Sequence, residues 1–200
     1  KRVLFFAHKQ FWTQYMARQL LLVLFLTIGA IPGWADYVIG TCTIRVPTPP
    51  ATECPGADLS YVNLAGLNLS GANLYNSNLY SSYLPAANLS FANLSFTTLN
   101  LAYLGGVNLT GANLYGAYLV NANLGNANLS GVNLNWANLD WANLHGVRSG
   151  GITGTPTVLP ANWQLTDGYL VGPYADLSYA NLSGLGITGA NLYGANLSFA

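Results

Sequence analysis

The best candidates for catalysis are three ionisable residues near one another in the chain, Asp140, His145 and Arg148. Hydrolysis or elimination on a polysaccharide needs paired carboxylates, or acids beside a basic group. The only other carboxylate between residues 57 and 146 is Asp58, at the opposite end of that segment. His145 follows a leucine at a variable position, which is typical of a solvated surface imidazole. No nucleophile elbow, phosphate-binding glycine loop or metal-ligand spacing occurs, so the sequence predicts no enzyme, cofactor or metal site.

Aromatic residues are the other side chains that could bind a ligand, since exposed rings stack on sugars and anchor protein partners. Trp136, Trp141 and Trp163 could form a local apolar patch. A patch of that size would be a partner site.

An internal repeat must position all of these residues. Eighteen leucines recur at every fifth position without interruption. A period of five matches neither a helix nor a plain alternating strand. The small residue two positions before each leucine shares its face, as in an extended segment. We therefore expect a short extended stretch and a bend in each unit, with the leucines in a narrow core. They are Leu59, Leu64, Leu69, Leu74, Leu79, Leu84, Leu89, Leu94, Leu99, Leu104, Leu109, Leu114, Leu119, Leu124, Leu129, Leu134, Leu139 and Leu144.

The repeated residues resemble a known family. The pattern A(N/D)LXX, as in GADLS, GANLY, AANLS, VNLTG and ANLHG, is similar to that of the pentapeptide-repeat proteins over residues 57–146 and again over 175–200. The resemblance implies an all-β fold, a right-handed, four-sided parallel β-helix with four units per coil. The main run would then contain about 4.5 coils.

The position before each leucine supports four units per coil. It is nearly always Asn, and the departures Tyr83, Thr98, Tyr103 and Tyr118 fall on two adjacent faces of a 20-residue register. Among the outward aromatic residues of the main run, only Tyr83 and Tyr103 would stack on neighbouring coils, so no continuous aromatic stripe is predicted. Coils about 4.8 Å apart would let two unbroken asparagine columns form amide ladders. These columns are Asn68, Asn88, Asn108, Asn128 and Asn73, Asn93, Asn113, Asn133.

Residues 1–35 have the composition of a secretory signal. Basic residues precede an apolar run at 20–28, and the small-x-small triplet 33–35 follows. The run is shorter than the roughly 20 residues of a membrane span, although an uncleaved anchor or a buried helix stays open. We expect cleavage after Ala35, a secreted or periplasmic protein, and membrane contact only through this segment. Because the chain starts with Lys1, we also expect its natural start to lie upstream.

Removal of this segment changes the charge of the protein. Only Arg45 and Arg148 would remain against six acidic residues, giving a net charge of −4 and no lysine. A nucleic-acid-binding surface needs clustered lysine or arginine. The sequence therefore predicts no nucleic-acid partner.

The two cysteines, Cys42 and Cys54, lie between the signal and the first repeat. An even number in an exported chain favours a disulfide, which would stabilise by roughly 3 kcal/mol. Two cysteines without a nearby histidine make a poor metal site. We expect the proline-rich segment 36–56 to cap the first coil, because the end of a solenoid is an open strand edge.

Residues 147–174 interrupt the repeat, since the step from Leu144 to Leu177 is not a multiple of five. A turn at 166–168 between two short apolar stretches predicts a loop followed by a hairpin. This insert would either fold against the side of the helix or separate two stacks of coils. The second run, 175–200, stops within a unit, and we expect it to be truncated.

The resemblance implies two kinds of function. Some family members resemble a DNA duplex and protect DNA gyrase from quinolones, but mimicry of a duplex needs dense negative charge. Here the position that often carries Asp is almost always neutral Asn. We therefore favour an exported, non-catalytic scaffold that binds an unknown protein or glycan partner, with an extracellular glycan-binding module as a further hypothesis. Since many members pair end to end, a homodimer also stays open.

Overall fold

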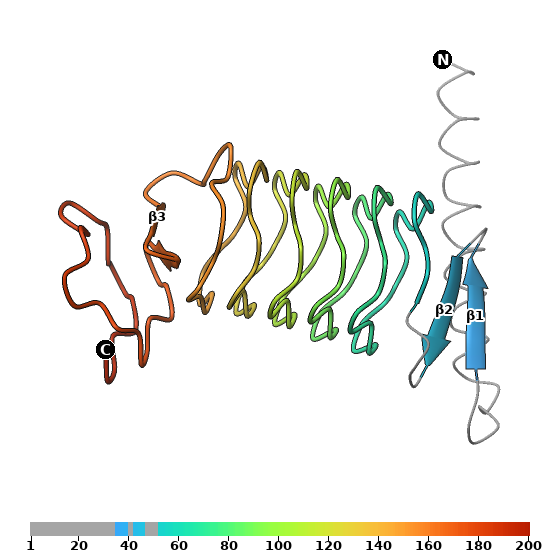
Figure 1. The fold of residues 1–200 in the computed structure, drawn as a ribbon, viewed down its shortest axis with the longest axis horizontal. Coiled ribbons are helices and arrows are strands. Elements are labelled where there is room, and N and C mark those ends of the chain that lie inside the picture. Colours follow the sequence, from blue (N-terminus) through green and yellow to red (C-terminus); the bar gives the residue numbers. More distant parts are fainter. Residues whose placement is uncertain (1–34, 40–41, 47–51) are drawn as a thin grey trace, which may run out of the picture.

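The computed structural model describes residues 35–39, 42–46 and 52–200, so the predicted signal segment lies outside the described residues except for Ala35. Figure 1 shows a row of coils that extends from a hairpin, β1–β2, toward the C-terminus. Within the described ranges, no helix is long and apolar enough to cross a membrane.

Each five-residue unit is an extended pair of residues followed by a tight turn. In the unit around Leu69, the amide of Ala72 donates to the carbonyl oxygen of Leu69 at 3.0 Å. The third residue of that turn, Gly71, has φ +67°, as a turn with one left-handed residue requires. Bulky residues also take this conformation, including Phe91 at φ 58° and Trp136 at φ 63°.

The units coil with a period of twenty residues. Parallel bridges join residue i to residue i+20, from Glu53↔Asn73 through to Asn138↔Val158. One coil therefore takes four five-residue units. Backbone hydrogen bonds run along the stack on either side of each bridge. The amide of Leu69 donates to Asn88 at 2.7 Å, and the amide of Asn88 donates back to Leu67 at 2.9 Å.

The leucines fill the inside of the stack. All eighteen are buried, and the least buried of them, Leu69, is 2% exposed. Where the small position is polar, its hydroxyl is satisfied inside the core. Ser77 and Ser82 donate to the carbonyl oxygens of the leucines three residues before them, both at 2.7 Å.

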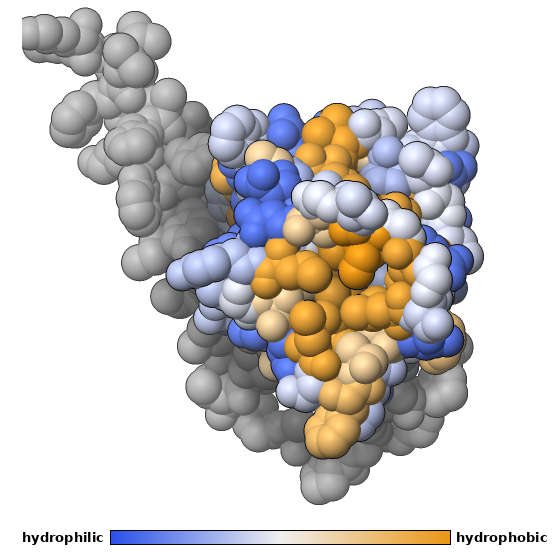
Figure 2. All heavy atoms as spheres, turned by 90° about the vertical axis from the view of Figure 1, so that its left-hand side faces the viewer, coloured by the Kyte–Doolittle hydropathy of each residue, from blue (hydrophilic) through white to orange (hydrophobic). Residues whose placement is uncertain are grey.

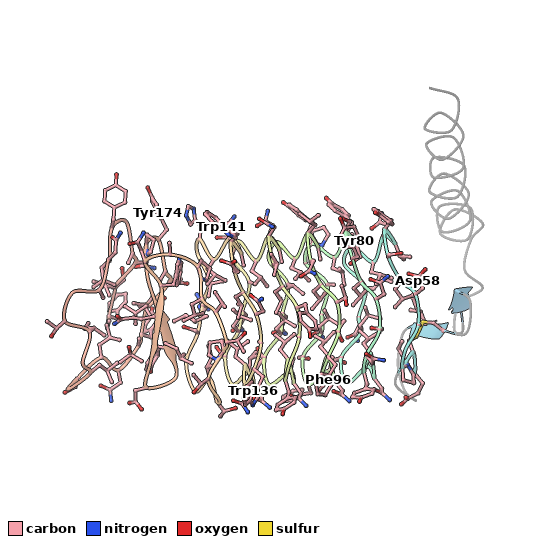
Figure 3. All side chains as sticks on the ribbon, turned by 90° about the horizontal axis from the view of Figure 1, so that it is seen from above. Asp58, Tyr80, Phe96, Trp136, Trp141 and Tyr174 are labelled. Carbon is pink, nitrogen blue, oxygen red and sulfur yellow. A yellow bond between two sulfur atoms is a disulfide. The ribbon has the colours of Figure 1, made fainter. Side chains whose placement is uncertain are left out.

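A disulfide-linked hairpin lies at the N-terminal end of the stack. Strand β1 (Ala35–Ile39) pairs antiparallel with β2 (Cys42–Val46). The predicted disulfide between Cys42 and Cys54 is confirmed, and Figure 3 shows it beside the first coil. Cys42, Ile44 and Cys54 are each at most 1% exposed and belong to the same core cluster as the leucines.

The interrupting segment contains the predicted hairpin. Strand β3 (Gln164–Thr166) pairs antiparallel with β4 (Tyr169–Val171). The two turn residues, Asp167 and Gly168, both have positive φ, 47° and 79°, which is the geometry of the Asp-Gly hairpin turn. The hairpin is held against the preceding chain, because the amide of Ile152 donates to Gly168 at 3.1 Å.

The interrupting segment forms part of the stack itself. Bridges continue the coil from Asn128 to Arg148, and Arg148 then bridges Asp176. The side chains of Arg148 and Asp176 are 28 positions apart, whereas equivalent pairs elsewhere are 20 apart. One coil is therefore eight residues longer than the others. Of the two arrangements left open by the sequence, neither describes it, because the second run continues the first through this longer coil.

Candidate functional site

A shallow groove of about 710 Å³ crosses one face of consecutive coils, from the coil that holds Tyr103 to the one that holds Gly194. It follows three columns of outward positions, which are the bridge residue before each leucine and the two turn residues after it. Its lining is made of aromatic, amide and glycine residues: Tyr103, Gly105, Gly106, Asn123, Gly125, Asn126, Asn143, His145, Gly146, Tyr174 and Gly194.

One end of the groove is a tyrosine ring held flat against the coil. Tyr103 stacks on Tyr83 of the preceding coil, with ring centroids 5.1 Å apart and planes 21° from parallel, as expected from their positions in the 20-residue register. The ring also leans over Gly105, where an added Cβ would lie 3.1 Å from it. One face of Tyr103 is thus covered by Tyr83, and the other is turned along the stack toward the groove.

Asparagine amides and glycines form the floor. The Oδ1 of Asn123 accepts from the amide of Gly125 at 3.0 Å and from the Nδ2 of Asn143 at 3.1 Å. One coil before Asn123, the residue in the same column is Tyr103, whose side chain has no amide oxygen. The Nδ2 of Asn123 therefore has no hydrogen-bond partner among the described residues. The side chain of Asn126 lies across Gly146, where a Cβ would collide with its Oδ1.

The other end of the groove is an aromatic pair. The rings of His145 and Tyr174 have centroids 4.6 Å apart and planes tilted by 39°. Tyr193 supports Tyr174 from the following coil in an edge-on contact at 5.4 Å. Between the two ends, the lining contains no Asp, Glu, Lys or Arg.

A charged pair lies beside this face, in another column of the stack. Arg148 donates from Nε at 3.2 Å and from Nη2 at 2.9 Å to Oδ2 of Asp176. Burial acts to raise the pKa of Asp176, but the hydrogen bonds from Ser178 and Arg148 outweigh it, so that its pKa is lowered. Asn196 also donates to Asp176, at 3.1 Å. In the column of bridge residues that begins at Asn68, this ion pair takes the place of a hydrogen bond between two asparagine side chains.

Comparison with known proteins identifies the repeat. A family model described as "Pentapeptide repeats" matches in eight copies, over residues 53–86, 87–124, 108–146 and 174–200. The chain belongs to the pentapeptide-repeat family. No curated protein gives a significant match.

Several solved pentapeptide-repeat structures are similar to this chain. Rfr23 from the cyanobacterium Cyanothece 51142 is 36% identical, with 52% of this chain and 82% of that one covered at a TM-score of 0.42. A protein of the Arabidopsis thaliana thylakoid lumen is 23% identical over 52% and 69%, at 0.38. QnrB1, a plasmid-mediated fluoroquinolone resistance protein, is 22% identical over 73% and 79%, at 0.37. These TM-scores are low, so the family assignment rests on the repeat match.

The three catalytic candidates of this pentapeptide-repeat chain do not converge. His145 packs on Tyr174, and Arg148 is bound to Asp176. Asp140 sits in a turn where its own amide donates to Asn138 at 2.9 Å. Arg148 therefore serves as the ion-pair partner of Asp176 within a column of stacked side chains. In the part of the chain that the structure describes, no group of three or more His, Cys, Asp and Glu could hold a metal ion.

The three tryptophans do not form the single patch considered from the sequence. Trp136 and Trp141 are 62% and 73% exposed, but they lie at opposite edges of the coil in Figure 3. Trp163 is partly buried against both core clusters and lies on Gly172, where a Cβ would be 2.3 Å from its ring. It therefore fills the core of the longer coil.

The groove itself was missed by the sequence analysis, although its signal was present. In the 20-residue register, Gly105 and Gly125 occupy adjacent coils at a position that holds His145 one coil later. Because Gly105 and Gly125 have no side chains, a hollow forms between Tyr103 and His145.

Proposed function

We propose that this pentapeptide-repeat protein is an exported, non-catalytic scaffold that binds a protein or glycan partner. In this proposal its right-handed, four-sided β-helix of about 4.5 coils presents the side faces as the binding surface. The observation that carries the proposal is the hydrogen bonding of the outward asparagines.

These asparagines make the surface polar but rigid. Oδ1 of Asn88 accepts from the amide of Ser90 at 3.1 Å, and its Nδ2 donates to Oδ1 of Asn68 at 3.0 Å. Asn108 donates to Asn88 in turn, at 3.2 Å. A side chain that is already fixed loses little entropy when a partner binds. Such a surface is suited to recognition more than to chemistry.

The predicted ladders are present but discontinuous. Side-chain rungs join Asn68, Asn88 and Asn108 in one column. In the other they join Asn73 with Asn93 and Asn113 with Asn133. Within the described coils, no such rung joins Asn108 to Asn128 or Asn93 to Asn113. The unengaged amide groups at these breaks are available to a ligand.

Export is supported by the disulfide between Cys42 and Cys54. Disulfides persist in oxidising compartments and are rare in the cytosol. The signal segment that would direct export lies outside the described residues, and its removal after Ala35 would take only the first residue of β1.

Charge argues against the gyrase-protecting alternative. Asp58 and Asp140 are the only acidic residues between positions 57 and 146. A DNA duplex carries one phosphate charge about every 1.7 Å of its axis. The neutral asparagine columns do not reproduce that density.

The deciding experiment is intact mass spectrometry of the chain, expressed with residues 1–35 in place, on fractionated cells. We expect a secreted or periplasmic product that begins at Asp36 and is lighter by two hydrogen atoms than its reduced form. Sedimentation of the same product measures whether it is a monomer or a homodimer. An unprocessed cytoplasmic product with free thiols would reject export, and a gyrase supercoiling assay with quinolone would then follow.

A further inference from the structure

We propose that the groove between Tyr103 and the His145–Tyr174 pair binds a neutral polysaccharide built of hexose units. This inference rests on the proposed function and names the ligand class for that surface. It follows from the aromatic ends of the groove, its unpaired amides and its lack of charge.

The free face of Tyr103 provides a stacking platform. Tyr83 covers the other face at 5.1 Å, and the ring is 42% exposed. A hexose ring has an apolar face of C–H groups that packs on an aromatic ring, while a tyrosine hydroxyl remains free for hydrogen bonding. Because Tyr83 and Gly105 already fix the ring, binding does not have to order it.

Amide groups in the floor match sugar hydroxyls. The Nδ2 of Asn123 is an unpaired donor beside Tyr103, because the amide column ends there. The exposed amide of Asn126 makes no side-chain hydrogen bond within the described residues and offers both a donor and an acceptor. Each sugar hydroxyl can donate once and accept, so it pairs with either group.

The dimensions and charge of the groove exclude other common ligands. Two coil spacings separate Tyr103 from His145, roughly 10 Å at about 4.8 Å each, which is the length of an extended disaccharide. The volume of about 710 Å³ is that of a ligand site. Phosphorylated or acidic ligands require Lys or Arg, and the lining has none.

The glycines keep this space open. Gly125 has a backbone conformation open to any residue. A Cβ there would lie 3.1 Å from Oδ1 of Asn123, 3.5 Å from Nδ2 of Asn143 and 3.7 Å from the carbonyl oxygen of His145, so its one tight contact is with a side chain. A larger side chain at position 125 would therefore be tolerated by the fold and would fill the groove. His145 shows that a histidine fits at the equivalent position of the next coil.

The test is titration calorimetry on the purified full chain with cellohexaose, laminarihexaose and mannohexaose, and with polygalacturonate as the charged control. The variants are Tyr103→Ala, the groove-filling Gly125→His, and Tyr118→Ala as a matched control. Tyr118 also occupies a bridge position and is 51% exposed, but it lies outside the groove. Circular dichroism melts establish that each variant folds.

We expect the wild-type chain to bind at least one of the neutral hexasaccharides. Tyr103→Ala and Gly125→His should each weaken binding about tenfold, whereas Tyr118→Ala should change it by less than about twofold. The inference is overturned if no neutral hexasaccharide binds, if Tyr118→Ala weakens binding as much as Tyr103→Ala, or if only polygalacturonate binds.

The result is separable from the test of export. A chain that is processed and oxidised but binds no saccharide contradicts this inference and leaves the scaffold proposal in place. A chain that binds saccharide in vitro but stays unprocessed in the cytoplasm contradicts export and leaves the groove assignment in place.

Discussion

The same six residues, GANLYG, occur at 111–116 in the main run and at 189–194 in the second run. The tyrosine of each copy makes a similar ring contact with the preceding coil. Tyr115 meets Phe96 edge-on at 5.3 Å, and Tyr193 meets Tyr174 edge-on at 5.4 Å. Their backbone bonds to that coil differ, because the amide of Asn113 donates to Ala92 at 2.9 Å and the amide of Asn191 has no such bond within the described chain.

Burial follows this difference. Leu114 is fully buried at 0% exposure, whereas Leu192 only packs partly against a small cluster formed by Val171, Ala175, Leu177 and Ala180. Figure 2 looks onto this end of the stack and shows apolar residues gathered on it. The same six residues thus bury their leucine completely only where the unit is bonded in register to the neighbouring coil.

The largest expected effect is a comparison of leucine truncations in the two copies. Leu114→Ala should lower the free energy of unfolding by about 2–5 kcal/mol, because it leaves a cavity between two coils. Leu192→Ala should lower it by about 1 kcal/mol, since that side chain is already partly exposed. Chemical denaturation measures both. Equal losses would show that the burial of the leucine does not determine the cost of its truncation.

Removal of the disulfide should raise the hydrogen-exchange rates at the N-terminal end of the stack toward those at the C-terminal end. The double variant Cys42→Ser, Cys54→Ser loses a cross-link worth roughly 3 kcal/mol. Hydrogen exchange should then accelerate at residues 57–64, toward the rates at 180–200, and remain slow at 100–130. Unchanged exchange at 57–64 would mean that hairpin β1–β2 is held by packing alone.

A smaller difference in stability is expected between Asn88 in the main run and Asn191 in the second run, because in the described chain only the first of them donates a side-chain hydrogen bond to an asparagine of the preceding coil. Asn88→Asp removes the Nδ2 donor to Asn68 and should cost about 1–2 kcal/mol at neutral pH. In Asn191, Oδ1 accepts from the amide of Tyr193 at 3.0 Å, which an aspartate can also do, so Asn191→Asp should have little effect. The cost at position 88 should shrink at pH 3, where a protonated carboxyl donates again. A cost that is independent of pH would assign it to something other than the lost donor.

The smallest effect concerns the junction between the two runs. The pKa of Asp176 is lowered in the folded chain, so its contribution to stability is present above the usual value of 3.8 and is lost as pH falls through the lowered value. The contribution should be below about 1 kcal/mol, because Arg148 is 59% exposed and screened by solvent. Comparing acid unfolding of wild type with Asp176→Asn measures it, and identical pH profiles would contradict it.

Much of the fold could be predicted because the physical cause is local. The five-residue spacing of leucine places Leu59 to Leu144 on one side of the chain, and the Asp167-Gly168 pair identifies the hairpin turn. The alignment of the second run could not be predicted. It depends on Arg148 and Asp176, whose separation of 28 positions carries no periodic signal.

The groove was not predicted, because its signal is spread over residues twenty positions apart. It is defined by side chains one coil apart and by the absence of side chains at Gly105 and Gly125. Residue types at Asp140, His145 and Arg148 suggested chemistry because they are close in sequence. In a β-helix, however, sequence neighbours five residues apart lie on adjacent faces, whereas residues twenty apart are in contact.

The longer coil between Arg148 and Asp176 has a consequence for the evolution and engineering of this chain. Eight additional residues and a hairpin are accommodated while the column through Arg148, Asp176 and Asn196 keeps its register. Selection can therefore change the length and composition of this coil without changing the packing of the other coils. A protein engineer who inserts a peptide into this coil would have to keep the Asp167-Gly168 turn intact, because the carbonyl oxygen of Gly168 accepts the amide of Ile152.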